Sequence, residues 1–333
     1  MTTLVTGATG FVGGNLARAL WARGEDVRAL VRPSANDLAI RETGVVQVTG
    51  DLLDSESVRR AAEGCETVYH CAAIYSFWSP RPREMYRSNV VGTVNLLDAA
   101  RRAGVRRVVF TSSVATIGIP ENGSRDPEHL GTEEMPPRPG LLIGYYKQSK
   151  YATEQIALAA NDHEMEVVVV NPCAPVGEWD VKPTPTGQIP LFFARGRAPG
   201  YISTGMNLID VADVAEGHIS AMERGVPGER YILGCRNLTL KEIFDILSQI
   251  TGRRAPNIHI PRWAILGVAY FDEFIEGTLL RRPPSVPVEA IKITKHPMYV
   301  SSKKAVAELG LPQSPVEVAL EKAVRWFRDH GYL

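Results

Sequence analysis

The sequence predicts an α/β fold: a doubly wound parallel sheet with helices on both faces, joined to a smaller, mainly helical C-terminal domain. Short runs rich in Val, Ile and Leu alternate with helical patterns through the first half of the chain. Strands that are buried on both faces are apolar along their length, and the helices between them provide the crossovers of a parallel sheet. A glycine-rich turn follows the first run, and the sequence becomes proline-rich after Asn171.

The elements follow one another in a regular order. After each apolar run we expect a turn and then a helix, with ligand-binding residues at the carboxyl ends of the strands. The expected strands lie within 2–6, 26–31, 45–50, 67–73, 105–113 and 166–172, and the clearest helical patterns cover 15–24, 90–104 and 146–160.

The two expected domains are discontinuous in sequence. The main domain comprises residues 1–171 plus about 208–237, where a strand, a helix and a further strand are expected to return to the sheet. The smaller, substrate-binding domain comprises about 172–207 plus 238–333. Five prolines within 171–190 exclude a regular helix or a central strand there. In the last helix, Ser314 and Glu317 are expected to form a capping box around a proline.

Composition excludes several classes of partner. The 37 basic and 37 acidic residues balance, so no global field favours nucleic acid or an anionic membrane. The four cysteines are widely spaced and the seven histidines are scattered, so no metal site is expected. Reduced cysteines and a start without a signal-peptide pattern predict a cytoplasmic protein.

One apolar stretch, Trp263 to Leu280, is long enough to raise the question of a membrane. Asp272, Glu273 and Glu276 interrupt it, and a spanning helix needs about 20 mostly apolar residues. We interpret it as an amphipathic helix packed on the protein, with peripheral membrane contact as the weaker alternative.

The first turn is typical of a phosphate-binding loop. Gly7, Gly10 and Gly13 link the first strand to the first helix with GxxGxxG spacing. Glycine lets the backbone approach a pyrophosphate, whose charge then lies at the helix N-terminus. A purely structural turn is the alternative, but the position of the glycines at the start of an alternating α/β pattern favours a dinucleotide.

The second strand bears on which dinucleotide is bound. It ends at Val31 and Arg32, with no carboxylate to hold ribose hydroxyls. An arginine there suits a 2′-phosphate, so NADP(H) is favoured and NAD(H) stays possible; a solvated arginine is the alternative interpretation. Asp51 and Leu52, after the third strand, are expected to bracket the adenine.

The segment "YYKQSK" suggests acid–base chemistry. On a helix, Tyr146 and Lys150 share a face, whereas the neighbouring Tyr145 gains no cation at that spacing. A nearby ammonium, together with an oxidised nicotinamide, is expected to lower the phenol pKa from about 10. Ser112 and Ser113 follow the fifth strand, where a hydroxyl would hydrogen-bond a substrate oxygen, or only form a turn.

Together these motifs resemble the extended short-chain dehydrogenase/reductase superfamily, also called the NAD-dependent epimerase/dehydratase superfamily. The matching stretches are "TGATGFVG", "GDLLD", "HCAA", "SNVVGT", "FTSSVATIG", "YYKQSK" and "VNP". The resemblance implies a Rossmann domain and a catalytic set of Ser113, Tyr146 and Lys150, with Ser112 as the neighbouring alternative. The cofactor-binding residues it implies are Gly7, Gly10, Phe11, Val12, Gly13, Arg32, Asp51, Leu52, Ala72, Ala73, Asn89, Tyr146, Lys150, Asn171 and Pro172.

Within the superfamily, the chain resembles both dihydroflavonol-4-reductase-like reductases and hopanoid-associated sugar epimerases. In either reaction Tyr146 would pass a proton to or from a ketone or secondary alcohol while hydride moves to or from the nicotinamide. A reductase stops there, whereas an epimerase returns the hydride to the other face. A catalytically silent, dinucleotide-sensing regulator is the alternative of another class.

The reductase is favoured because an expected diphosphate clamp is missing. Sugar-nucleotide enzymes of the superfamily usually carry an arginine where this chain has 206–208, although Arg195 or Arg197 would be a substitute. Polar residues of the proline-rich loop, among them Asp180, are expected either to face a small-molecule substrate or only to form the loop. The resemblance also implies a homodimer formed through helices 89–103 and 146–160.

Overall fold

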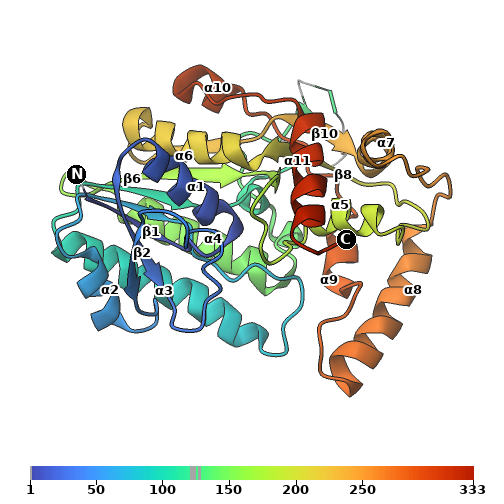
Figure 1. Ribbon diagram of the computed structural model, residues 1–333, viewed down its shortest axis with the longest axis horizontal. Helices are drawn as coiled ribbons and strands as arrows, with labels where there is room; N and C mark the ends of the chain where they lie inside the picture. Colours follow the sequence, from blue (N-terminus) through green and yellow to red (C-terminus); the bar gives the residue numbers. More distant parts are fainter. Residues whose placement is uncertain (1, 121–124, 127–128) are drawn as a thin grey trace.

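The main domain is built on a seven-stranded parallel sheet. The computed structural model describes residues 2–120, 125–126 and 129–333, and Figure 1 shows the sheet between two layers of helices. Strand order reverses beside β1, which pairs with β2 on one side and β4 on the other. In spatial order the strands are β3 (Val46–Thr49), β2 (Asp26–Val31), β1 (Thr2–Thr6), β4 (Thr67–His70), β5 (Arg107–Thr111), β6 (Glu166–Pro172) and β9 (Arg230–Leu233).

Helices cover both faces of this sheet, as the alternating pattern predicts. One apolar core lies under α1 (Phe11–Ala22), α6 (Val211–Arg224) and the short α10 (Lys303–Leu309). A second core lies under α2 (Ser55–Ala62), α3 (Pro82–Arg102) and α4 (Gly144–Ala159) on the opposite face. The doubly wound α/β prediction is therefore confirmed.

A second, three-stranded sheet organises the smaller domain. Its order is β10 (Arg236–Thr239), β8 (Gly205–Asp210) and β7 (Ala174–Val176), with β8 antiparallel to β10 and parallel to β7. The expectation that the strand near residue 208 returns to the main sheet is wrong, because only β9 does so. The chain leaves the main sheet directly after β6, and the short β7 that follows pairs with β8.

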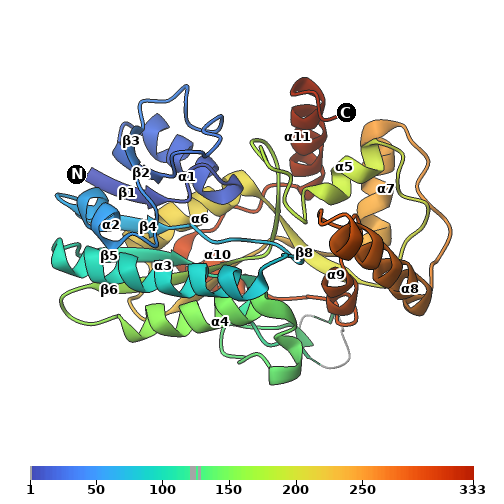
Figure 2. The ribbon, with the colours of Figure 1, turned by 90° about the horizontal axis from the view of Figure 1, so that it is seen from below.

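Helices pack on the smaller sheet and beside it. Apolar side chains of α5 (Gln188–Ala194), α7 (Leu240–Thr251) and α11 (Val316–Asp329) form its core. A separate lobe consists of α8 (Arg262–Asp272), the π-helical η4 (Glu273–Leu279) and α9 (Val288–Ile293), and it projects from the body in Figures 1 and 2. Short 3-10 turns, η1 (Val114–Thr116) and η3 (Pro139–Leu141), precede α4.

The start of α11 differs from the expected capping box. The helix begins at Val316, one residue later than expected, and Pro315 precedes it without a side-chain cap. The Ser314 hydroxyl instead donates to Asp213 at 2.8 Å, and Glu317 pairs with Arg236 at 2.7 Å. Tertiary partners on α6 and β10 therefore replace the local cap.

Candidate active site

The glycine-rich turn forms a tight cradle at the carboxyl edge of the main sheet. Gly7 has a φ of +76°, and a β-carbon there would lie 2.7 Å from the backbone nitrogen of Ala72. A β-carbon on Gly13 would lie 2.4 Å from the carbonyl oxygen of Gly7. Gly10 precedes α1, and its amide donates to the Gly7 carbonyl at 2.8 Å. Only glycine fits this turn, which brings free backbone amides of the α1 N-terminus to the sheet edge, where an anionic group binds well.

Phe11 and Val12 begin α1 directly behind the cradle, with Phe11 buried. Arg32 lies exposed at the tip of β2, the neighbouring strand. Asp51 accepts a hydrogen bond from the amide of Leu53 at 2.9 Å, so part of its carboxylate is engaged in a local turn. Leu52 packs closely against Gly92 of α3, where a β-carbon would lie 3.0 Å from that of Leu52.

An aromatic cluster follows β4 and was missed by the sequence analysis. Ala72 and Ala73 lead from the strand into this segment. The Tyr75 ring lies 4.6 Å from that of Tyr146, and the Phe77 ring lies 5.5 Å from Tyr75. The run "IYSFW" directly after "HCAA" was the available signal, because a residue at the end of a parallel strand faces the ligand crevice.

Helix α4 presents Tyr146 and Lys150 on one buried face. The Lys150 ammonium donates to the Thr111 carbonyl at the end of β5 at 2.6 Å and lies 4.9 Å from the centre of the Phe110 ring. Burial lowers the pKa of Lys150 to about 8, an effect that Glu154 opposes. The structure places the predicted pair on one face of α4, with Lys150 at the end of β5, as the helical spacing requires.

The phenol differs from the expectation of a lowered pKa. Burial raises the pKa of Tyr146 to about 12, and a hydrogen bond with Ser113 opposes that rise. The Lys150 ammonium donates to the Thr111 carbonyl. At neutral pH the phenol therefore holds its proton.

The two neighbouring serines have different surroundings. Ser113 bonds Tyr146, and its Oγ also accepts from the amide of Ala115 at 3.1 Å. Ser112 is buried behind it, with its hydroxyl 3.4 Å from that of Thr116. The geometry therefore points to Ser113 as the hydroxyl beside the phenol.

A buried polar network behind Lys150 was also missed. Glu154 lies one turn after Lys150 and is fully buried. Its carboxylate accepts from Thr116 at 2.6 Å, from Asn171 at 2.7 Å and from Arg230 at 3.0 Å. The available signal was the spacing: Glu154 follows Tyr146 by eight residues and so lies on the same face of the helix.

Two predicted cofactor residues, Asn171 and Asn89, are engaged within the protein. The Asn171 amide donates to Glu154 and to Thr116, so this side chain belongs to the buried network; Pro172 follows it at the end of β6. The Asn89 side chain bonds both backbone groups of Ile74 and donates to Ser149 at 3.0 Å. It therefore ties the aromatic segment to α4.

The proline-rich loop is held by its own polar side chains. Asp180 accepts from the Thr184 amide at 2.9 Å and from its hydroxyl at 2.9 Å, and burial raises the Asp180 pKa to about 6. Thr186 donates to the Pro175 carbonyl at 3.2 Å. Asp180, Thr184 and Thr186 thus form the loop, while Trp179 packs on Arg18 of α1 at 3.9 Å.

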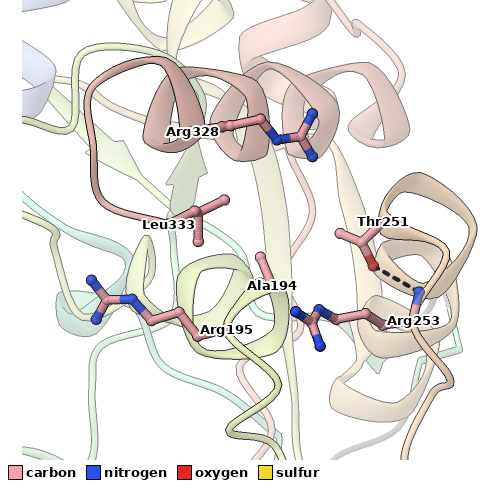
Figure 3. Close-up of a pocket in the computed structure, with 6 residues that line it drawn as sticks. All are labelled: Ala194, Arg195, Thr251, Arg253, Arg328 and Leu333. Atoms are coloured by element: carbon pink, nitrogen blue, oxygen red, sulfur yellow. Dashed lines mark hydrogen bonds between the residues drawn. The ribbon is translucent and has the colours of Figure 1, made fainter.

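The two substitutes for a diphosphate clamp, Arg195 and Arg197, follow α5 in the smaller domain. Arg195 donates to the Tyr332 carbonyl at 2.9 and 2.6 Å, close to the C-terminus. It lines a pocket with Arg253 and Arg328, between the C-terminal ends of α5, α7 and α11 (Figure 3). Arg197 is exposed in the loop after α5. The three positively charged side chains of the pocket are balanced by helix C-termini, where cations are favoured.

The C-terminal lobe contacts the beginning of α4. Gly144 has a φ of +81°, and a β-carbon there would lie 1.9 Å from the Glu289 carboxylate of α9. Burial raises the pKa of Glu289 to about 7, whereas nearby Lys147 lowers it. Burial in turn lowers the pKa of Lys147 to about 8. A half-buried carboxylate of the smaller domain thus adjoins the first turn of the helix that carries Tyr146.

Comparison with known proteins identifies the class. The family model described as "NAD dependent epimerase/dehydratase family" matches residues 3–234. The chain belongs to that family, and it is an NAD(P)-dependent enzyme of the extended short-chain dehydrogenase/reductase type.

Three similar proteins cover essentially the whole chain. A Synechocystis protein named "Putative dihydroflavonol 4-reductase" is 47% identical over 99% of this chain and 95% of its own length. Sterol demethylase protein B of Methylococcus capsulatus is 37% identical over 100% of both chains. The crystal structure of gox2253 is 41% identical, with a TM-score of 0.86 over 100% of this chain and 99% of that one. These comparisons support a family reductase or epimerase that acts on a small molecule.

Proposed function

We propose that the chain is a ketone reductase or secondary-alcohol dehydrogenase in which Tyr146 is the general acid and base. The observation that carries this proposal is the buried contact between Tyr146 and Ser113 at the end of β5, with Lys150 one turn further along α4. A phenol whose pKa is about 12 is protonated at neutral pH, which is the form that a general acid requires.

The glycine cradle fits a dinucleotide, because its backbone contacts leave no space for any β-carbon at Gly7 or Gly13. Gly10, Phe11 and Val12 would place the α1 amides at the pyrophosphate. Arg32 would meet a 2′-phosphate, which favours NADP(H) over NAD(H). When bound, the nicotinamide ring supplies or accepts the hydride.

The remaining residues divide into contact and positioning roles. Ser113 would orient the substrate oxygen beside the phenol, and Lys150 would bind the ribose. Asp51 and Leu52 would bracket the adenine, and Ala72 and Ala73 would let the dinucleotide lie against the backbone. We assign Asn89 and Asn171 to positioning, since their amides already bond protein groups.

An apolar substrate suits the site better than a sugar nucleotide. The aromatic rings of Tyr75 and Phe77 lie beside Tyr146. Arg195, the candidate phosphate clamp, is directed to the Tyr332 carbonyl instead. A relative with whole-length similarity is named as a sterol demethylase protein, and rigid apolar rings are the kind of substrate that aromatic side chains bind well.

The first experiment measures cofactor and turnover separately. Purified protein should bind NADPH more tightly than NADH, and it should reduce apolar cyclic ketones with release of the oxidised cofactor. A dinucleotide that stays bound through turnover of a sugar nucleotide would instead identify an epimerase. Binding without turnover on any carbonyl compound would favour a sensing regulator.

Two further properties are part of the proposal. All four cysteines are free, which suits a reducing cytoplasm. Association as a homodimer through α3 and α4, which pack against each other, is expected to give a particle of twice the chain mass in light scattering. A monomer at micromolar concentration would contradict the dimer without affecting the proposed chemistry.

A further inference from the structure

The lobe formed by α8 and η4 carries an unusual concentration of exposed apolar side chains. Trp263 is 79% exposed and Phe271 is 69% exposed. Helix α8 buries only one residue, Ala269, against the rest of the protein. The exposed apolar residues of this lobe, which we call the outer face, are Trp263, Val268, Tyr270, Phe271, Phe274, Leu279 and Leu280. Patches of this kind on a protein surface mark a binding surface.

The three acidic residues that interrupt this apolar stretch in the sequence have hydrogen-bond or ion-pair partners within the lobe. Asp272 accepts from the Val286 amide at 2.8 Å, and Glu273 accepts from the Val288 amide at 2.9 Å. Both carboxylates therefore hold the returning segment that leads into α9. Glu276 is neutralised by an ion pair with Arg282. These three charges interrupt the stretch as a membrane span; within the lobe the carboxylates of Asp272 and Glu273 are each held by a backbone amide, and only Glu276 is paired with a basic side chain.

Basic side chains lie at the edges of the outer face. Arg262 begins α8 beside Trp263, Arg281 follows η4, and both are exposed. The Lys292 ammonium of α9 lies 5.5 Å from the centre of the Tyr270 ring. Burial and the charges of Lys295 and Arg262 lower the pKa of His296, so positive groups converge at the base of the lobe. Lys292 lies close enough to Glu289 to lower the pKa of that carboxyl, whereas among the described residues no ion pair within 4 Å involves Arg262 or Arg281.

From this arrangement we propose that the outer face of α8 and η4 docks the protein on the surface of an anionic lipid bilayer. Tryptophan and tyrosine favour the interface between lipid and water, phenylalanine and leucine enter the acyl boundary, and arginine and lysine meet the anionic headgroups. Among the described residues, none of the helices combines the length and the apolar character that a membrane span requires.

Its position suits such a contact. In Figures 1 and 2 the lobe projects at the end of the molecule that carries the smaller domain, away from β1, β2 and β3. Gly277 of η4 lies beside Trp78 of the aromatic segment, since a β-carbon on Gly277 would be 3.0 Å from the Trp78 ring nitrogen. The surface that meets the bilayer is therefore continuous with the segment that packs on Tyr146.

The test measures flotation of the full-length protein with vesicles of phosphatidylcholine, with and without phosphatidylglycerol. We expect binding to the vesicles that contain phosphatidylglycerol, weakened by high salt. The double variant Trp263→Ser/Phe271→Ser should lose about tenfold or more in partitioning, because both side chains would enter the bilayer interface. Trp21→Ser, which changes an exposed tryptophan on α1, is the matched control and should float like the unchanged protein.

Three outcomes would overturn the proposal. The first is that the unchanged protein does not float with the vesicles. The second is that the double variant floats as well as the control. The third is that, without lipid, the unchanged protein forms an oligomer that the double variant does not form. The last result, measured by light scattering, would show that a second copy covers the outer face. Thermal unfolding of each variant establishes that it is folded. Arg262→Glu, which reverses one charge beside Trp263 and keeps the aromatic rings, should reduce flotation separately. The result is independent of the proposed reductase activity.

Discussion

Helices α4 and α8 both carry aromatic and basic side chains, but they place them in opposite environments. Helix α4 buries Tyr146, Lys147 and Lys150, whereas α8 buries only Ala269 and exposes its aromatic rings. The buried polar groups of α4 have partners, such as the Thr111 carbonyl for Lys150. Burial changes the pKa of a titratable group, while exposure of an aromatic ring provides a surface for binding. The same residue types would therefore serve the proposed chemistry in one helix and the proposed docking in the other.

The largest expected effect is on α4. Tyr146→Phe removes only the hydroxyl and should lower turnover by about 100-fold or more, because positioned acid–base groups contribute about 10²–10⁴ to the rate. NADPH binding, measured by fluorescence titration, should change little. Tyr145→Phe is the matched control and should keep turnover near the original value. Equal turnover in the two variants would remove the basis for assigning the phenol.

The glycine cradle gives the next largest effect. Gly7→Ala combines a left-handed backbone, with φ of +76°, and a close contact with the Ala72 backbone, so dinucleotide binding should be lost and stability reduced. Gly24→Ala has a similar φ of +80° but nothing near its β-carbon, and it should cost only the strain of about 1–2 kcal/mol. Denaturant unfolding and NADPH titration of both variants separate strain from contact. Equal losses of stability and of NADPH binding in the two variants would mean that the close contact between Gly7 and the Ala72 backbone is unimportant.

A moderate effect is expected behind Lys150. Glu154 raises the pKa of that ammonium, so Glu154→Gln should move the alkaline limb of turnover to lower pH. The midpoint should fall below about 8, the pKa that burial gives Lys150 in the unchanged protein. Glu321→Gln, on an exposed part of α11, controls for loss of one negative charge. A pH profile of Glu154→Gln that is reduced in height but not shifted would indicate a structural role only.

The smallest effect concerns the contact between the lobe and α4. The pKa of Glu289 is about 7 in the folded protein against an ordinary value of 4.5, so its stabilising contribution is complete below pH 4.5 and is lost as the pH rises through 7. Glu289→Gln should flatten this fall in the free energy of unfolding between those pH values. The measurement is denaturant unfolding at several pH values, and an unchanged slope would contradict the raised pKa.

The sequence predicts most of the main domain because its signals are local. Apolar runs, glycine turns and helical spacing place β1, α1 and the pair Tyr146 and Lys150 without knowledge of distant contacts. The assignment of β8 was wrong because pairing with β7 and β10 is a tertiary choice. Similarly, the Ser314 cap was wrong because Asp213, 101 residues away, binds that hydroxyl.

The site itself was predicted in part for the same reason. Spacing on one helix identifies Tyr146 and Lys150, but the partners of Glu154 come from three other segments. The direction of the Tyr146 pKa also depends on burial by the aromatic segment, which spacing does not report. For α8 and η4, three acidic residues are visible in the sequence, but their partners at Val286, Val288 and Arg282 are not.

The central claim is that a carbonyl oxygen binds between Tyr146 and Ser113. A crystal structure of the protein with an NADPH analogue and an apolar cyclic ketone tests this binding position most directly. We expect the ketone oxygen within hydrogen-bond distance, about 2.5–3.2 Å, of both the Tyr146 hydroxyl and the Ser113 Oγ. A ketone bound with its oxygen away from Tyr146, or held by Ser112 instead, would contradict the account.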